Sequence, residues 1–454
     1  MNLDPQKLDS QKLDPQKLDS QKLAPESSSL KRPDLKIENA TLVGYQTPQT
    51  ITIQSGLITE IAPSHDLSQP LPISATGADS ASDCETIEAN RKLVIPSLID
   101  PHLHLDKALL LEQYPAQQGT FAEALADTAA LKQNFTLEDI QSRARRVIES
   151  EIAFGTTTIR THIEVDPILQ LTSLEAILPL KKAYAWGVDL QLAIFAQEGI
   201  TNQPGTEKLL HQALSLGGDL IGSAPYTDTD PIRNIQIVFD LAQTYDCDVD
   251  FHLDFLDNHE PLLLPSVIKE TVKRGWQNRV CLGHMTRLAG LLPAELSAIA
   301  ADLKAAGISI LALPASDLYM MARQDTHNIR RGVAPVHTLT DLGVNCAIAT
   351  NNVQNLFTPF GDGDPLKICT LLAQVLQLGT PSRHAQCLEM ATTRAARAIG
   401  IDNHSIAIGH PANLVMLDAR TASEAIGSAP VGRTTLKAGK LISRTDVHKQ
   451  LIPH

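Results

Sequence analysis

The sequence predicts an α/β protein built as a (β/α)8 barrel, the TIM-barrel architecture, with a small β-sandwich domain formed by N- and C-terminal segments. Eight short apolar runs recur between Leu93 and Ala349, and helical patterns lie between most of them. Short alternating segments separated by turn residues occur at both ends of the chain, over 35–95 and 405–450. The alternative is an open doubly wound sheet, but no glycine-rich nucleotide loop follows the first run.

The predicted strands and helices alternate through the middle of the chain. The helices include LEDIQSRARRVIESEIAFG and PAELSAIAADLKAAG, and each of these ends on a glycine, which is typical of a helix C-terminus. The barrel is therefore predicted to occupy residues 96–404. The predicted strands lie at 93–99, 156–160, 190–195, 219–223, 248–251, 279–282, 308–313 and 344–349.

The first residues form a five-residue repeat, with LDPQK and LDSQK alternating from Leu3 to Lys22. One leucine in five residues produces neither a helical nor a strand face, and proline recurs. We therefore predict a disordered, low-complexity tail over residues 1–30.

Composition excludes several classes of function. The formal net charge of −13 argues against nucleic acid and against an anionic membrane surface as partners. No apolar run is long enough to cross a membrane, and the N-terminus lacks the apolar core of a secretory signal. The six cysteines show no CxxC spacing, which favours reduced thiols in a cytoplasmic protein.

A pair of histidines follows the first predicted strand. His102 and His104 are two residues apart in PSLIDPHLHLDK, and side chains at that spacing project from the same side of a strand. Two imidazoles on one side suit a first-row divalent metal ion. The alternative is two unrelated loop histidines, but polar and metal-binding residues also end most of the other predicted strands, where a barrel places its active site.

Seven stretches of the chain together resemble the amidohydrolase superfamily, and its cytosine deaminase-like branch in particular. The resemblance extends from about Leu35 to Arg444 and excludes only the repeat tail. The stretches are IPSLIDPHLHLDK, FGTTTIRTHIEVD, LQLAIFAQEGI, DVDFHLD, VCLGH, DTHNIRRG and HPANLVMLDA.

The resemblance implies one divalent metal ion, Zn or Fe, held by His102, His104 and His252. It also implies that His284 holds the attacking water and that Gln197 contacts the amide edge of a ring substrate. A divalent cation on neutral imidazoles lowers the pKa of water towards neutrality and polarises the carbon under attack. The alternative for each histidine is a hydrogen-bonded core imidazole.

The chain departs from the family pattern at two positions. Phe255 stands where the family has the acid that protonates the ring, and Asn351 stands where it has the aspartate that binds the metal. An amide oxygen can coordinate a metal, but an amide is no base near neutral pH. Asp254 is our first candidate for a replacement catalytic carboxylate, because strand alternation places it on the face of His252. Asp257 and Glu198 follow.

These residues predict a metal-dependent hydrolase of non-peptide C–N bonds that releases ammonia or an amine from a small cyclic amidine or amide. Phe255 makes the predicted pocket more apolar, which suits a ring or an N-alkyl group and makes Phe255 a candidate substrate-binding residue. The alternative is a degenerate amidohydrolase that binds a ring ligand without turnover, and Phe255 and Asn351 favour it. The expected partner is a small ring molecule, with a homo-oligomer as a further possibility.

Overall fold

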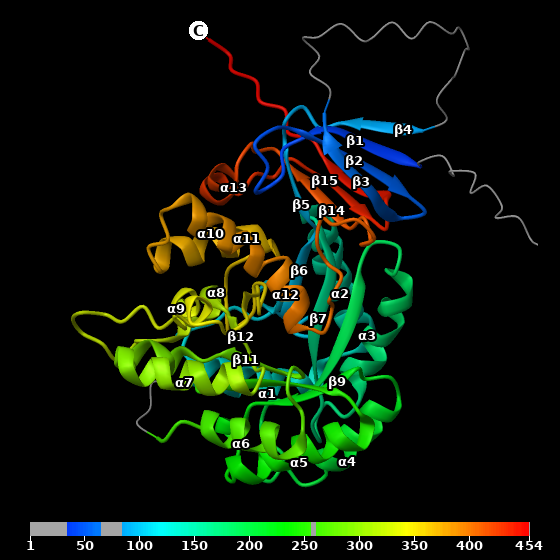
Figure 1. The fold of residues 1–454 in the computed structure, drawn as a ribbon. Coiled ribbons are helices and arrows are strands. Elements are labelled where there is room, and N and C mark those ends of the chain that lie inside the picture. Colours follow the sequence, from blue (N-terminus) through cyan, green and yellow to red (C-terminus); the bar gives the residue numbers. More distant parts are fainter. Residues whose placement is uncertain (1–33, 65–83, 256–259, 454) are drawn as a thin grey trace, which may run out of the picture. The chain divides into compact units, whose positions relative to one another are not determined.

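The computed structural model describes residues 34–64, 84–255 and 260–453 (Figure 1). The predicted tail over 1–30 lies outside these residues. Within them, the predicted fold class is confirmed: an eight-stranded parallel barrel sheet is joined to sheets from both ends of the chain.

The barrel strands are paired in chain order, as expected for consecutive strand–helix units. The first and last strands close the barrel through a parallel bridge between Leu103 and Asn351. There the backbone N–H of Asn351 donates to the carbonyl of His102, and that of His104 donates to the carbonyl of Asn351, both at 2.9 Å. The strands are β6 (Leu98–Leu103), β7 (Thr156–Glu164), β8 (Asp189–Ala196), β9 (Leu220–Ser223), β10 (Asp248–Leu253), β11 (Val280–His284), β12 (Ser309–Ala312) and β13 (Cys346–Ile348).

The helices between these strands have the local signals that the sequence predicts. The helix Leu137–Phe154, α2, begins after Thr136, whose side chain accepts from the backbone N–H of Asp139, and it ends at Gly155 with a left-handed φ of 102°. The others are α1 (Phe121–Leu131), α3 (Thr172–Ala183), α4 (Thr206–Ser215), α5 (Pro231–Tyr245), α6 (Leu264–Arg274), α7 (Pro293–Ala305), α8 (Pro314–Met320), α9 (Val336–Asp341), α10 (Pro365–Val375), α11 (Pro381–Met390), α12 (Thr393–Ala398) and α13 (Ala422–Ser428).

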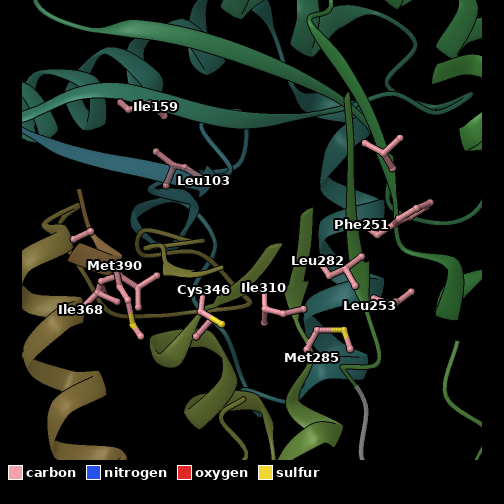
Figure 2. Close-up of a cluster of buried hydrophobic side chains, with 14 of the residues drawn as sticks. Leu103, Ile159, Phe251, Leu253, Leu282, Met285, Ile310, Cys346, Ile368 and Met390 are labelled. Atoms are coloured by element: carbon pink, nitrogen blue, oxygen red, sulfur yellow. The ribbon is translucent and has the colours of Figure 1, made fainter. Parts of the chain in front are cut away.

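Alternation along the strands separates the core from the chemistry. On β10, Val249, Phe251 and Leu253 belong to the apolar core that the strands share with the surrounding helices. Figure 2 shows part of this core, with Phe251 and Leu253 near Leu282 and Met285. The intervening residues of β10, Asp250 and His252, therefore face the barrel interior.

Two four-stranded sheets from the chain ends form the predicted β-sandwich. Their order is β3-β2-β1-β4 and β16-β15-β14-β5. They share an apolar core that includes Ile37, Ile51, Val94, Leu414 and Leu436. The strands are β1 (Leu35–Ala40), β2 (Gln49–Gln54), β3 (Leu57–Pro63), β4 (Glu85–Glu88), β5 (Leu93–Pro96), β14 (Leu414–Leu417), β15 (Arg433–Lys437) and β16 (Lys440–Thr445).

The prediction of one barrel strand over 93–99 is wrong in its bounds. Leu93–Pro96 is β5, which pairs with β14 in the sandwich, and the barrel begins only at Leu98. Asp100, which the prediction took as the end of the strand, is fully buried within β6, where Thr350 hydrogen-bonds its carboxylate. Two adjacent buried strands from different sheets give one continuous apolar run, so hydrophobicity alone does not separate them.

Two further expectations concern membranes and cysteines. In the described part of the chain, no helix has both the length and the apolar character that a membrane span requires. The six cysteines are free thiols, and five of them are buried.

Candidate active site

Three imidazoles converge at the carboxyl ends of the barrel strands. The Nε2 atom of His252 lies 3.1 Å from Nε2 of His102 and 3.0 Å from Nε2 of His104. Ring nitrogens bound to one zinc at 2.0–2.1 Å would lie roughly 3.0–3.4 Å apart. The spacing and the donor type therefore fit a single divalent metal ion.

The fold explains why these side chains meet. His102 lies on β6 and His104 directly after it, while His252 faces inward from β10 on the other side of the barrel interior. A Cβ atom on Gly283 of β11 would come within 2.8 Å of the His102 ring, so glycine provides the space for that imidazole. Closure of the barrel at Leu103 and Asn351 then brings Asn351 to the same end.

Burial keeps these imidazoles in the form that binds metals. It lowers the pKa of His102 to about 3, and it lowers the pKa values of His104 and His252 well below the usual value. Nδ1 of His102 lies 3.4 Å from Oδ1 of Asp250, which also lies 3.4 Å from Nε2 of His162. A carboxylate on this side of His102 favours a proton on Nδ1 and leaves Nε2 as a metal ligand.

A small pocket opens above the imidazoles. One side of it is aromatic and apolar, and the other side is polar. The aromatic rings are packed against one another: Phe255 lies 5.6 Å from Phe121 and 6.2 Å from Tyr226, measured between ring centres. The lining residues are His104, Lys107, Phe121, Gln197, Tyr226, His252, Phe255, His284, Ser316, Met320, Asn351, Asn352 and Phe357.

His284, at the end of β11, lines this pocket, and its ring packs against that of Phe255 with 4.2 Å between ring centres and an angle of 40° between the ring planes. Its Nδ1 atom lies 2.7 Å from a carboxylate oxygen of Asp317, which is fully buried on α8. Burial raises the pKa of Asp317, and the hydrogen bond to His284 opposes that shift. The sequence places Asp317 after a strand end, but only the fold reveals its contact with His284.

Asn351 and Gln197 also line the pocket. The Nδ2 group of Asn351 donates to Oγ of Ser316 at 2.8 Å, while its Oδ1 atom is buried and has no hydrogen-bond partner among the described residues. An unpaired buried acceptor beside three imidazoles fits a cation. Oε1 of Gln197 lies 3.3 Å from Nζ of Lys107; because lysine only donates, the amide NH₂ of Gln197 points away from it.

The structure contradicts the expectation that Asp254 faces the site beside His252. β10 ends at Leu253, and Asp254 has a left-handed φ of 44°, so alternation does not continue to it. Its two carboxylate oxygens accept the backbone N–H groups of Leu263 and Leu264 at 2.9 and 3.1 Å, where α6 begins. Asp254 therefore shapes the loop before α6 and is not among the pocket-lining residues.

Of the other two candidate carboxylates, Asp257 lies outside the described residues. Glu198 does not line the pocket, because its carboxylate pairs with Lys132 at 2.5 Å. Burial raises the pKa of Glu198 to about 7, although Lys132 acts in the opposite direction.

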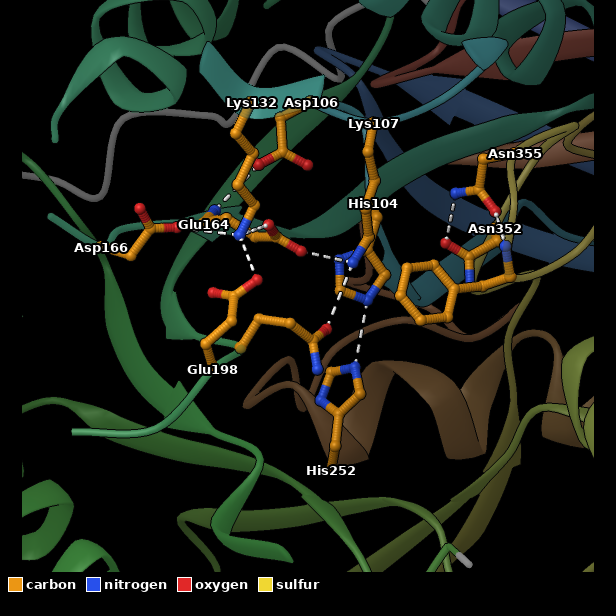
Figure 3. A network of polar contacts seen from close by, with 12 residues as sticks. His104, Asp106, Lys107, Lys132, Glu164, Asp166, Glu198, His252, Asn352 and Asn355 are labelled. Atoms are coloured by element: carbon orange, nitrogen blue, oxygen red, sulfur yellow. Dashed lines mark hydrogen bonds and ion pairs between the residues drawn. The ribbon is translucent and has the colours of Figure 1, made fainter. Parts of the chain in front are cut away.

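A buried ionic network lies on the polar side of the pocket (Figure 3), and the sequence predicted a role for its member Glu198 but not for its lysines. Nζ of Lys132 lies 2.7 Å from Glu164, 2.8 Å from Asp166 and 2.5 Å from Glu198. Glu164 also pairs with Lys107, which reaches the pocket. Burial acts to raise the pKa of Glu164, but the two lysines outweigh it and lower that pKa to about 2. The available signal was Lys107 itself, a lysine in the HLHLDK motif three residues after His104.

Comparison with known proteins agrees with this geometry. A model of the amidohydrolase family matches residues 119–442. The chain belongs to the amidohydrolase family. The predicted resemblance is thereby confirmed, together with its deaminase-like branch.

Individual relatives match over most of their length. The chain is 28% identical to a pterin deaminase of Rhizobium rhizogenes (strain K84 / ATCC BAA-868), covering 89% of this chain and 92% of that protein. It is 26% identical to N-isopropylammelide isopropyl amidohydrolase of Pseudomonas sp. (strain ADP), covering 80% of this chain and 89% of that protein. The crystal structure of 5-methylcytosine deaminase from Klebsiella pneumoniae liganded with 5-fluorocytosine is 30% identical, with a TM-score of 0.83 over 92% of this chain and 99% of the other.

Proposed function

We propose that this amidohydrolase uses one divalent metal ion to hydrolyse a C–N bond of a small nitrogen-containing ring, with release of ammonia or an amine. The convergence of His102, His104 and His252 beneath a pocket with an aromatic wall carries the proposal. The named activities of the pterin, 5-methylcytosine and isopropylammelide relatives support the choice of a ring substrate.

The three histidines would hold the metal through Nε2, with Oδ1 of Asn351 as a further oxygen ligand. The proposed ion is zinc or iron, because neutral imidazoles suit both. When bound, it would supply Lewis-acid activation of water and of the ring carbon. The buried, neutral state of the imidazoles leaves their lone pairs available to it.

The remaining side chains would bind and orient the ring. Phe255, Phe121 and Phe357 offer an apolar face for a planar ring or for an alkyl group on the leaving amine. The amide NH₂ of Gln197, which points away from Lys107, would donate to a carbonyl or ring nitrogen at the edge of the substrate.

The second candidate is a protein that binds such a ring without turnover. The observation that favours it is that, among the described residues, no carboxylate lines the pocket. Phe255 and Asn351 occupy the positions where the family would have acids. Metal content and product release together separate the two candidates.

The test is metal analysis of the purified protein combined with a screen of aminopyrimidines, aminotriazines and pterins for amine or ammonia release. We expect bound zinc or iron, and release from at least one ring class. His252→Ala should lose both the metal and the activity, because it removes the central imidazole. His211→Ala, which removes a half-buried histidine on α4 that contacts Tyr245, is the matched control and should keep both.

Full metal occupancy in His252→Ala would contradict the ligand set. Metal and tight ring binding without product release from any class would favour the second candidate.

A further inference from the structure

The strongest unassigned feature is the contact between His284 and Asp317. His284 is a pocket-lining side chain, and an imidazole is the side chain most often used as a general acid and base. The ring of His284 contacts the carboxylate of Asp317, which is fully buried and does not line the pocket.

The Asp317 carboxylate is fixed from two sides. Oδ1 lies 2.7 Å from Nδ1 of His284, and Oδ2 accepts the backbone N–H of Leu313 at 3.2 Å. Because a carboxylate only accepts, this arrangement places the imidazole proton on Nδ1. The lone pair of the neutral ring is then on Nε2, the ring nitrogen that does not contact Asp317.

The other acids near the site have different partners. Both oxygens of Asp254 bind backbone N–H groups at the start of α6, and Glu198 is paired with Lys132. Glu164 lies between Lys107 and Lys132. His284 lines the pocket and is not one of the three proposed metal ligands. Within the described part of the chain, Asp317 is thus the acid that contacts this imidazole.

We propose that Asp317 is the positioning residue of a His284–Asp317 pair that carries out both proton transfers of the reaction in place of the family's acids at 255 and 351. This inference rests on the proposed function. The O–H bond of the attacking water breaks as its oxygen bonds to the ring carbon, the proton goes to Nε2 of His284, and the electron pair of the ring C=N bond moves onto the ring nitrogen. That electron pair then re-forms the C=N bond as the C–N bond to the leaving group breaks, Nε2 returns the proton to the leaving nitrogen, and the ring is released as its hydroxy form. Asp317 stabilises the imidazolium between the two steps.

The backbone around the pair favours one fixed geometry. His284 and Met285 both have left-handed φ values, 70° and 52°, at the end of β11. Non-glycine residues rarely adopt this conformation unless the surrounding structure imposes it. The ring of His284 also packs against that of Phe255, so Phe255 supports the pair although it replaces an acid.

The decisive variant is Asp317→Asn. The N–H of Leu313 requires an acceptor, so the amide oxygen of the asparagine should turn to Leu313 and its NH₂ should turn to Nδ1 of His284. That hydrogen bond moves the imidazole proton to Nε2 and leaves the pocket without a base. We expect kcat to fall by about 10²–10⁴-fold with KM and metal content unchanged.

A second readout does not depend on turnover. Nitrogen NMR of histidine-labelled protein, with and without bound metal, should show neutral His284 protonated on Nδ1, and in Asp317→Asn protonated on Nε2. Asp230→Asn makes the same chemical change at the N-cap of α5 and should leave both the tautomer and kcat as in the wild type.

The outcomes are distinguishable. A wild-type protein with His284 protonated on Nε2 overturns the proposal whether or not any variant folds. An active wild type whose kcat survives Asp317→Asn overturns it as well. A wild type that releases no product from any ring, yet shows the Nδ1 tautomer and its loss in Asp317→Asn, supports the positioning role of Asp317 while the proposed function fails.

Discussion

At the scale of single residues, strand alternation is reliable only while the strand continues. His102 and His104 lie at the end of β6 and reach the same point as His252 from β10. Asp254 is two residues after His252, but the chain has already turned into a left-handed conformation there, and its carboxylate binds the backbone of the next helix. The same spacing therefore predicts convergence in one case and misleads in the other.

Asn351 provides a residue-scale prediction about metal affinity. Asn351→Asp would place a negative charge beside three neutral imidazoles, and the hydroxyl of Ser316, which accepts from the Asn351 amide in the wild type, would have to turn and donate to the new carboxylate. We expect the dissociation constant for zinc to fall by at least about 10-fold, because affinity rises with the charge of the ligand set. Competition with a chelating dye measures it. Asn352→Asp, the neighbouring amide whose oxygen accepts from Asn355, is the matched comparison and should change affinity less. Equal tightening by both variants would contradict a specific role for position 351.

At the scale of elements, one buried lysine connects three segments. Lys132 begins the short helix η2 (Lys132–Asn134), and its ammonium group binds carboxylates at or just beyond the ends of β7 and β8. The long connection between β6 and α2 contains α1, whose Phe121 lines the pocket. The ion pairs of Lys132 therefore hold the connection between β6 and α2, which contributes Phe121 to the pocket, against the carboxyl ends of β7 and β8.

Glu198 makes the free energy of unfolding depend on pH. Its pKa of about 7 in the folded protein exceeds the ordinary value of 4.5, so its contribution to stability is complete below about pH 4.5 and is lost as the pH rises through 7. Glu164, with a pKa lowered to about 2, changes only at more acidic pH. The wild type should therefore lose stability as the pH rises from about 5 to 8, whereas Glu198→Gln lacks this loss. The free energy of unfolding of Glu198→Gln minus that of the wild type should increase over this pH range.

Urea denaturation at several pH values measures this trend. Glu112→Gln is the control. Glu112 is an exposed acid that pairs with Arg146, and this pairing lowers the pKa of Glu112, so the variant should show no such trend between about pH 5 and 8. A difference for Glu198→Gln that stays flat or falls with pH would count against the assignment.

At the scale of the whole molecule, one buried ion pair connects the sandwich to the barrel helices. The guanidinium of Arg433 on β15 binds both carboxylate oxygens of Asp364 at 2.8 and 2.7 Å, and Asp364 caps α10. Arg433 also donates to the carbonyl of Phe154 at the end of α2. Both charged side chains are fully buried, so water cannot solvate one of them if the other is removed.

Arg433→Met should therefore lower the free energy of unfolding by about 3–5 kcal/mol, because it leaves the Asp364 carboxylate buried without a partner. Arg444→Met removes an exposed pair with Asp446 close by and should cost less than about 1 kcal/mol. Chemical denaturation of both variants makes the comparison. If the double variant Arg433→Met with Asp364→Asn is as unstable as Arg433→Met alone, the unpaired charge is not the cause.

The class of fold, the order of strands and helices, and the histidines that meet at the strand ends could all be predicted from the sequence. These follow from patterns within a few residues: alternation along strands, apolar periodicity along helices, and glycine at helix ends such as Gly155. The division of the run 93–99 between two sheets was not visible, because both halves are equally apolar.

The contacts between polar side chains could not be predicted in this way, because they depend on how the elements fold together. Closure of the barrel brings Asn351 beside His102, Asp317 reaches His284 from the next strand–helix unit, and Lys132 gathers carboxylates from two strand ends. The partners of such contacts are far apart in the sequence: Asp317 and His284 are separated by 33 positions, and Thr350 and Asp100 by 250. Local periodicity fixes the side of an element that a residue occupies, whereas the pairing of charges depends on how distant elements are packed together.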